Sequence, residues 1–211
     1  MTTASGDEPA PRAVEAVASL IESRLTIAVA ESLTGGLLAA ELIGVPGASA
    51  AVRGAVGPAY PIIFRFSQWK ITDYAGSLAD DPTQLQELLA PLVEAGVDVL
   101  HPSTRRHYTP AFPDADPKLS LAGWTKKVTG LPVIAVGSVG LETSFRSEEH
   151  GQVIQPAPLD RLVEQFEAGD FDVVAVGRAL LADPGWVHRL RDGELDAFTG
   201  YDPEAALSSL R

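Results

Sequence analysis

The sequence contains no cysteine, which excludes disulfide bonds, thiolate metal sites and cysteine nucleophiles. It is also poor in basic residues, because 16 Lys and Arg stand against 28 Asp and Glu and give a net charge of −12. Such acidity argues against nucleic acid or an anionic membrane as the main partner. No apolar run approaches the roughly 18 residues of a transmembrane helix, and residues 1–12 are unlike a signal peptide. We therefore expect a cytoplasmic protein without a membrane partner, in which residues 1–10 form a disordered tail.

The rest of the chain contains four short runs rich in apolar and β-branched residues. They occupy residues 61–66, 97–100, 132–136 and 173–176, and helical patterns follow them at 81–96, 119–130, 157–170 and 183–198. Nearly continuous apolar strands that alternate with helices indicate an α/β protein with a covered parallel sheet. Units of this length are typical of a (β/α)8 barrel, of which four units are visible.

Two of the helical patterns allow more detailed predictions. Pro91 interrupts the pattern at 81–96, so we expect either a kink there or a late start of that helix. In the pattern at 157–170, one face collects Leu159, Leu162, Val163 and Phe166, which predicts a buried side.

The last two strands end alike, in PVIAVGSVG and VVAVGRALL. Gly137 is followed by Ser138, and Gly177 by Arg178. At the carboxyl ends of parallel strands, glycine lets a ligand approach the backbone, and a guanidinium adds a forked donor for phosphate. A plain turn is the alternative for each glycine. Two such ends in register favour a phosphate site.

Polar side chains also mark the first two strands. The period of two places Arg65 and Ser67 on one side of the first strand and Phe64 and Phe66 on the other. Arg65 needs an acceptor, which is either an internal carboxylate or a ligand. On the next strand, His101 shares its side with Ser103, and it serves either as an acid, base or substrate contact or as a satisfied polar residue.

Metal binding has little support in the sequence. Asp114 and Asp116 lie two residues apart in a loop, where solvated acids are the simpler interpretation. We expect no metal site.

The blocks FRFSQWK, GVDVLHPSTRRHYTPAF, LAGWTKKVTGLPVIAVGSVG and VVAVGRALLADPGWV together resemble the C-terminal half of an NADH:flavin oxidoreductase of the Old Yellow Enzyme type. The resemblance covers about residues 52–211. It implies a partial (β/α)8 TIM barrel with strands five to eight of the parent barrel, FMN as cofactor, and NADH or NADPH as reductant. The small-molecule substrate would be an activated alkene.

The same resemblance implies roles for individual residues. Arg65 would face the pyrimidine edge of the flavin, where a positive charge stabilises negative charge at N1 and O2 of the reduced ring. Gly137, Ser138, Gly177 and Arg178 would hold the FMN phosphate. The family's paired His/His or His/Asn for substrate, in an HGYL-like block, has no counterpart in this sequence. A truncated form with impaired turnover is therefore one interpretation.

Residues 11 to about 54 differ from that family. Their blocks AESLTGG and VPGASA resemble the nicotinamide-nucleotide amidase domain of the competence-damage-inducible protein family. The resemblance implies Ser32 as a nucleophile, with Thr34, Gly35 and Gly36 shaping the pocket. A plain helix cap is the alternative for Ser32, because the family's block with Tyr and Lys is absent.

These two resemblances predict the organisation of the chain. We expect a tail over residues 1–10, an amidase-like fragment over 11–54 that adds a strand (26–30) and a helix, and an FMN-binding half barrel over 55–211. The junction falls near residues 47–57. The alternative functions are an amidase-like hydrolase and a non-catalytic fusion remnant. A half barrel exposes strand edges and apolar surface, so we expect that the strand at 26–30 pairs with the edge strand that begins at Pro61, that two chains associate, or both.

Overall fold

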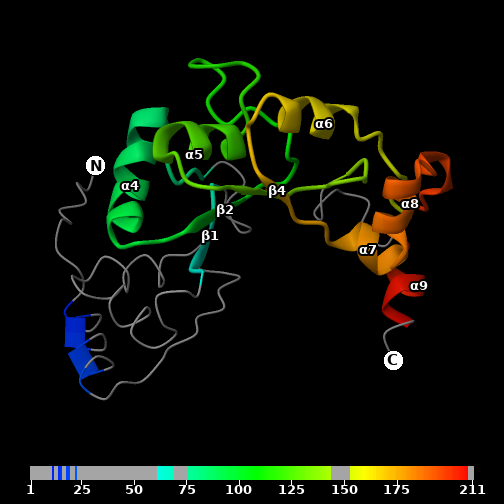
Figure 1. Ribbon diagram of the computed structural model, residues 1–211, viewed down its shortest axis with the longest axis horizontal. Helices are drawn as coiled ribbons and strands as arrows, with labels where there is room; N and C mark the ends of the chain where they lie inside the picture. Colours follow the sequence, from blue (N-terminus) through cyan, green and yellow to red (C-terminus); the bar gives the residue numbers. More distant parts are fainter. Residues whose placement is uncertain are drawn as a thin grey trace. The chain divides into compact units, whose positions relative to one another are not determined.

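Four short strands alternate with helices along the part of the chain that the structure describes (Figure 1). This computed structural model describes residues 61–68, 76–143 and 153–208, together with Pro11, Val14, Glu15, Ala18, Ser19 and Glu22. Two compact units are present: unit 1 comprises Met1–His101 and Val128–Pro132, and unit 2 comprises Pro102–Lys127 and Val133–Arg211. The expected strand at 26–30 and the expected junction at 47–57 lie outside the described residues.

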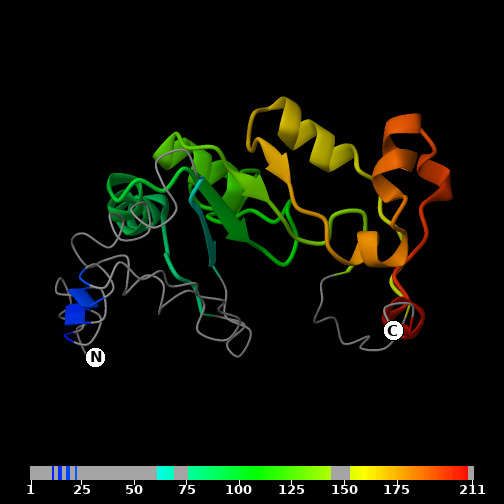
Figure 2. The same ribbon diagram turned by 60° about the horizontal axis from the view of Figure 1, so that its bottom comes forward.

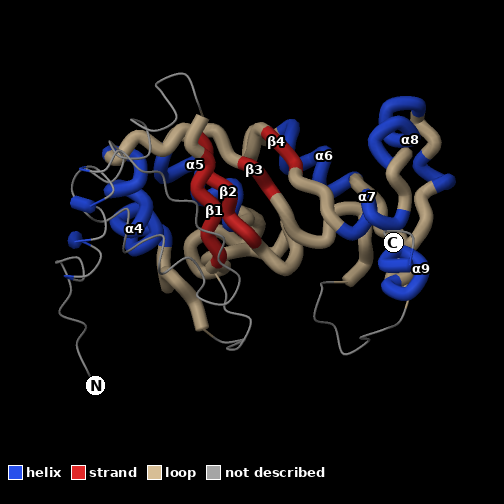
Figure 3. The backbone as a smooth tube through the Cα atoms, turned by 90° about the horizontal axis from the view of Figure 1, so that it is seen from below, coloured by secondary structure: helices blue, strands red, loops and turns tan. Residues whose placement is uncertain are grey.

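The strands lie where the apolar runs predicted them. They are β1 (Ile63–Ser67), β2 (Val99–Ser103), β3 (Ile134–Ala135) and β4 (Val173–Val174). β1 neighbours β2, and β3 pairs in parallel with β4, with Ile134 opposite Val173 (Figure 3). In unit 2, Ser103 also forms a parallel bridge with Val136. The α/β class with parallel strands is confirmed, while the strands of the described residues form two-stranded sheets and close no barrel.

In unit 1, helix α4 (Pro82–Glu94) begins at the first residue that the pattern allows. The Asp81 carboxylate accepts hydrogen bonds from the backbone N–H groups of Thr83 (2.7 Å) and Gln84 (2.9 Å), which caps the helix. The expectation of a late start is therefore wrong, since the cap and Pro82 fix the start upstream of Pro91. Pro91 lies inside the helix on an exposed position, where water can satisfy the carbonyl that its missing N–H leaves without a bond.

Shorter helices follow each later strand. They are α5 (Leu121–Thr129), α6 (Asp160–Glu167), α7 (Arg178–Ala182), α8 (Trp186–Asp192), the 3-10 helix η1 (Leu195–Ala197) and α9 (Pro203–Ser208). The predicted buried face of α6 is only half correct. Leu159 and Leu162 are buried, but Val163 and Phe166 are 49% and 54% exposed, because the described part of unit 2 packs no element over them. No helix among the described residues combines the length and the apolar character needed to span a bilayer.

An aspartate at the start of β2 fastens that strand to the residue before β1. The Asp98 carboxylate accepts a hydrogen bond from the Ile62 N–H at 2.7 Å. In return, the Asp98 N–H donates to the Ile62 carbonyl oxygen at 2.9 Å. The side chain and the backbone of one aspartate thus bind the N–H and the carbonyl oxygen of a single residue. We call these two hydrogen bonds an aspartate clasp.

Unit 2 repeats the clasp between β3 and β4. The Asp172 carboxylate accepts from the N–H of Val133 at 2.9 Å, and the Asp172 N–H donates to the Val133 carbonyl oxygen at 3.0 Å. Val133 is completely buried, so its N–H has no access to water. The ammonium of Lys126, from α5, lies 2.6 Å from the same carboxylate and is the main cause that lowers the pKa of Asp172. The clasp therefore ties β3, β4 and α5 together.

Substitutions of Asp172 should separate the clasp from its ion pair. Asp172→Ala leaves the buried Val133 N–H without an acceptor and should lower the free energy of unfolding by about 1–3 kcal/mol. Asp172→Asn keeps a carbonyl acceptor and loses only the ion pair with Lys126, so about 0–1 kcal/mol is expected. Urea denaturation followed by circular dichroism measures both. Equal losses in the two variants would show that the ion pair, and not the clasp, carries the stability.

Candidate functional site

In unit 1, Arg65 and His101 occupy neighbouring strands. Phe64 and Phe66 are buried, at 8% and 3% exposure, whereas Arg65 between them is exposed. On β2, Leu100 and Pro102 are buried, and His101 lies on the half-buried side. The predicted alternation of both strands is confirmed.

His101 has the electrostatics of a neutral imidazole. Burial, and secondly the positive charge of Arg65, lower the pKa of His101 from 6.5 to about 4. Its Nε2 atom is buried and makes no hydrogen bond to any described residue. At neutral pH the ring is therefore uncharged.

In unit 2, Gly137 allows an unusually close approach of two backbone segments. Its φ is +134°, and a Cβ at this position would lie 2.6 Å from Oγ1 of Thr104 and 2.7 Å from the Thr104 carbonyl oxygen. The Gly137 carbonyl accepts from the His107 N–H at 3.0 Å, and the Thr104 hydroxyl donates to the Val136 carbonyl at 2.6 Å. The segment that approaches the Gly137 backbone is thus the loop after β2.

Ser138 and Arg178 meet at one carbonyl oxygen, that of Thr143. The Ser138 hydroxyl lies 3.0 Å from this oxygen and 2.8 Å from the Arg105 carbonyl oxygen. The Arg178 guanidinium donates to the same Thr143 oxygen through Nη2 at 3.0 Å. The structure therefore brings together the polar residues of the two Gly-tipped strand ends, which lie forty positions apart in the sequence.

The surroundings of Arg178 leave it partly accessible. Burial is the main cause that lowers the pKa of Arg178, while Tyr201, whose ring centroid lies 5.8 Å from the guanidinium carbon, acts in the opposite direction. The group still stays charged at any physiological pH. A Cβ at Gly177 would meet no atom within 4 Å, and Oγ1 of Thr143 is buried without a hydrogen-bond partner among the described residues. One cation, two hydroxyls and open space beside Gly177 form a set that suits an oxyanion.

Thr143 is the residue of this group that the sequence did not reveal. It lies in a polar loop with no motif, and its carbonyl oxygen, rather than its side chain, is the acceptor. Asp116, considered above as a metal ligand, instead accepts backbone hydrogen bonds from Lys118 (2.9 Å) and Leu119 (3.2 Å) and closes a turn. Ser32, Thr34, Gly35 and Gly36 lie outside the described residues, so their roles stay predictions.

Comparison with known proteins supports both resemblances. Residues 10–57 match the CinA C-terminal domain family. The chain is 62% identical over 37 residues to a CinA-like protein of Frankia casuarinae, covering 18% of this chain and 8% of that protein. It is 31% identical over 148 residues to an NADH oxidase of Thermoanaerobacter brockii, covering 67% of this chain and 20% of that protein.

Two parts of the chain are similar to two different kinds of protein. Its N-terminal segment is CinA-like, as AESLTGG and VPGASA predicted, and a longer part is similar to an NADH oxidase. The match spans only a fifth of the length of that oxidase and less than a tenth of the CinA-like protein. The predicted boundaries at residues 10 and 54 stay predictions.

The two glycines should respond differently to an added methyl group. Gly137→Ala forces Cβ into Thr104 at a positive φ and should lower the free energy of unfolding by about 1–3 kcal/mol. Gly177→Ala meets open space, so a loss of about 1 kcal/mol or less is expected. Thermal and urea denaturation of both variants test this. The interpretation is wrong if Gly177→Ala is the more damaging substitution.

The neutral His101 should make stability depend on pH. Its pKa is lower in the folded chain (about 4) than the ordinary value of 6.5. Between these values the unfolded chain binds more protons, so the free energy of unfolding should fall as pH drops from about 6.5 to about 4. His101→Gln should remove this share of the slope, while burial of His107, whose pKa is also lowered, leaves a further share in place.

The slope is measured by urea denaturation at several values between pH 7 and pH 4. His188→Gln serves as the control, because His188 is exposed on α8. An unchanged slope in His101→Gln, or an equal change in His188→Gln, would contradict the assignment.

Proposed function

We propose that this chain binds FMN and represents part of an NADH:flavin oxidoreductase of the ene-reductase type. The observation that carries the proposal is the convergence of Ser138 and Arg178 on the Thr143 carbonyl oxygen. Similarity to an NADH oxidase supports the same class. In this proposal, β1 to β4 take the places of strands five to eight of a (β/α)8 barrel.

The Thr143 oxygen marks where a phosphate oxygen would be held. Two donors from different strand ends point at this one neutral acceptor. A phosphate oxygen offers the same acceptor geometry with a negative charge, and charge-assisted hydrogen bonds from a guanidinium are about twice as strong as neutral ones. The Thr143 hydroxyl, which has no hydrogen-bond partner among the described residues, and the open space at Gly177 would accommodate the remaining oxygens. The residues present therefore fit a phosphate monoester.

FMN, when bound, would supply hydride transfer from a nicotinamide to an activated alkene. The residues of the chain would bind and orient it. Arg178 and Ser138 would hold the phosphate, and Arg65 would stabilise negative charge on the pyrimidine edge of the reduced ring. His101, which is neutral at pH 7, would offer a hydrogen bond to the substrate. Because the family's substrate-binding pair is absent from the sequence, we propose cofactor binding with impaired turnover.

Self-association stays part of the proposal. Ile63 of β1 and Val173 of β4 are each more than half exposed, at 54% and 52%. Apolar strand residues in water favour contact with a second chain.

The phosphate assignment predicts how FMN and riboflavin, which lacks the phosphate, differ in binding. Wild-type protein should quench FMN fluorescence and bind FMN more tightly than riboflavin. Arg178→Gln removes one charge-assisted contact and should weaken FMN binding about tenfold or more, with little change for riboflavin. Arg191→Gln is the matched control, because Arg191 is an exposed arginine paired only with its neighbour Asp192.

The titration separates binding from folding. Both variants should keep the far-ultraviolet circular dichroism of the wild type. Failure of the wild type to bind FMN at any accessible concentration, or equal losses in Arg178→Gln and Arg191→Gln, would overturn the phosphate assignment.

A further inference from the structure

A groove in unit 2 is lined by the start of helix α6 and the segment before it, and by residues of α8 and of the chain that follows α8. Figures 1 and 2 show α6 and α8 as neighbouring parts of this unit. The volume of the groove is about 590 Å³. Its lining combines apolar side chains with three carboxylates; the lining residues are Pro156, Ala157, Pro158, Leu159, Asp160, Val163, Glu164, Leu190, Asp196 and Phe198. We call it the α6–α8 groove.

The negative charge of this groove is not balanced within the described part of the chain. Asp160, Glu164 and Asp196 line the groove, and no lysine, arginine or histidine does. None of these three carboxylates forms an ion pair with a described residue. Three unpaired acids around one apolar depression create a local negative potential.

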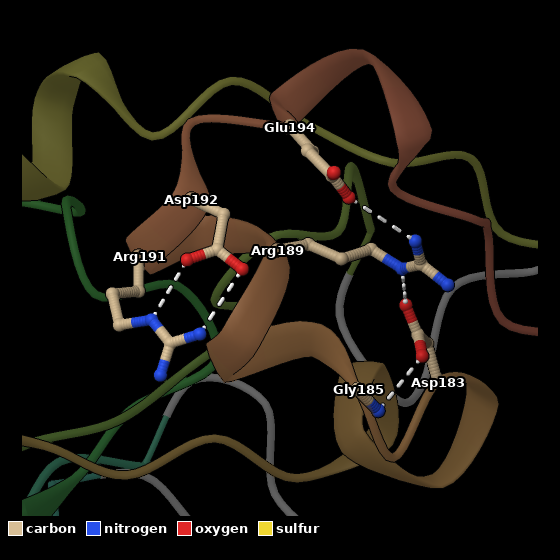
Figure 4. A network of polar contacts seen from close by, with 6 residues as sticks. All are labelled: Asp183, Gly185, Arg189, Arg191, Asp192 and Glu194. Atoms are coloured by element: carbon tan, nitrogen blue, oxygen red, sulfur yellow. Dashed lines mark hydrogen bonds and ion pairs between the residues drawn. The ribbon is translucent and has the colours of Figure 1, made fainter.

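The arginines of α6 and α8 already make other contacts. Arg189 of α8 binds Asp183 at 2.7 Å and Glu194 at 3.5 Å, and Arg191 binds Asp192 at 2.8 Å (Figure 4). Arg161 of α6 lies over the ring of Tyr108, with its guanidinium carbon 5.0 Å from the ring centroid. Neutralising the groove with these cations would require breaking contacts that the structure already contains.

Exposed apolar side chains occur on both helices, and two of them, Val163 and Leu190, line the groove. Val163 and Phe166 of α6 are 49% and 54% exposed, and Val187 and Leu190 of α8 are 53% and 39% exposed. Each pair is spaced three residues apart and so lies on one side of its helix. Covering them would bury apolar surface at about 25 cal/mol per Å².

We propose that the α6–α8 groove binds a basic amphipathic peptide segment of a protein partner. The apolar side chains of the segment would contact Val163, Leu190 and Phe198, and its lysines or arginines would pair with Asp160, Glu164 and Asp196. Charge complementarity selects this occupant, because an anionic ligand would be repelled. An acidic surface of a second copy would be repelled at this groove for the same reason.

The test uses the full chain and two fluorescein-labelled synthetic peptides. Both peptides place leucine on one helical face; one carries lysine and the other glutamate at the remaining positions. Fluorescence anisotropy should show binding of the lysine peptide, weakened by added salt, and no binding of the glutamate peptide.

Two variants of α6 provide the matched comparison. Glu164→Lys reverses a charge in the groove and should weaken binding of the lysine peptide about tenfold. Glu167→Lys makes the same change on the same helix outside the groove lining and should leave binding within about twofold. Val163→Asp should also weaken binding by removing the apolar contact.

Three results would overturn the proposal. They are equal binding of both peptides, equal effects of Glu164→Lys and Glu167→Lys, and no binding of the lysine peptide by a wild-type chain with an intact melting transition. Concentration-dependent dimerisation that Val163→Asp abolishes would also overturn it, because the groove would then be a contact between copies.

Discussion

The aspartate clasp is the interaction on which the strand arrangement depends. β3 and β4 are each only two residues long, so their own ladder supplies few hydrogen bonds. Asp98 and Asp172 each add a side-chain bond and a return backbone bond at the point where a strand begins. A buried N–H without an acceptor costs about 1–3 kcal/mol, so each carboxylate satisfies a group that the short strand could not. The clasps lie where the strands begin, and loops follow the other ends of the strands.

The candidate phosphate site of unit 2 depends on those loops. Gly137 lets the loop after β2 approach closely, and the next residue, Ser138, has a left-handed conformation with φ +50°. A serine rarely adopts such a conformation without compensation. Here its hydroxyl has two carbonyl oxygens within hydrogen-bond distance. The position of the Ser138 hydroxyl next to Arg178 thus follows from packing around a glycine.

Much of the fold could be predicted from residue patterns. The apolar runs located the four strands that the described residues form, and the period of two separated Arg65 from Phe64 and Phe66. These predictions succeeded because strand burial is a local property of alternation. The convergence of Ser138 and Arg178 could only be suspected, since the register between two distant strand ends depends on the whole unit.

The failures have equally specific causes. Thr143 contributes a backbone oxygen, and every residue has one, so composition carries no signal for it. Periodicity predicts which residues of α6 share a face, but it does not say whether another element covers that face. Val163 and Phe166 satisfy the pattern and remain exposed. The pattern at 81–96 located the start of α4, and only the alternative of a late start was wrong, because the Asp81 cap outweighs the proline that follows ten positions later.

Among the described residues, each unit contains one such clasp. Asp98 joins β1 to β2, and Asp172 joins β3 to β4. Neither clasp borrows an atom from the other unit. Each strand pair therefore contains both partners of its own clasp. The predicted junction near residues 47–57 precedes both clasps, so joining unlike sequence there leaves the hydrogen bonds of each clasp intact.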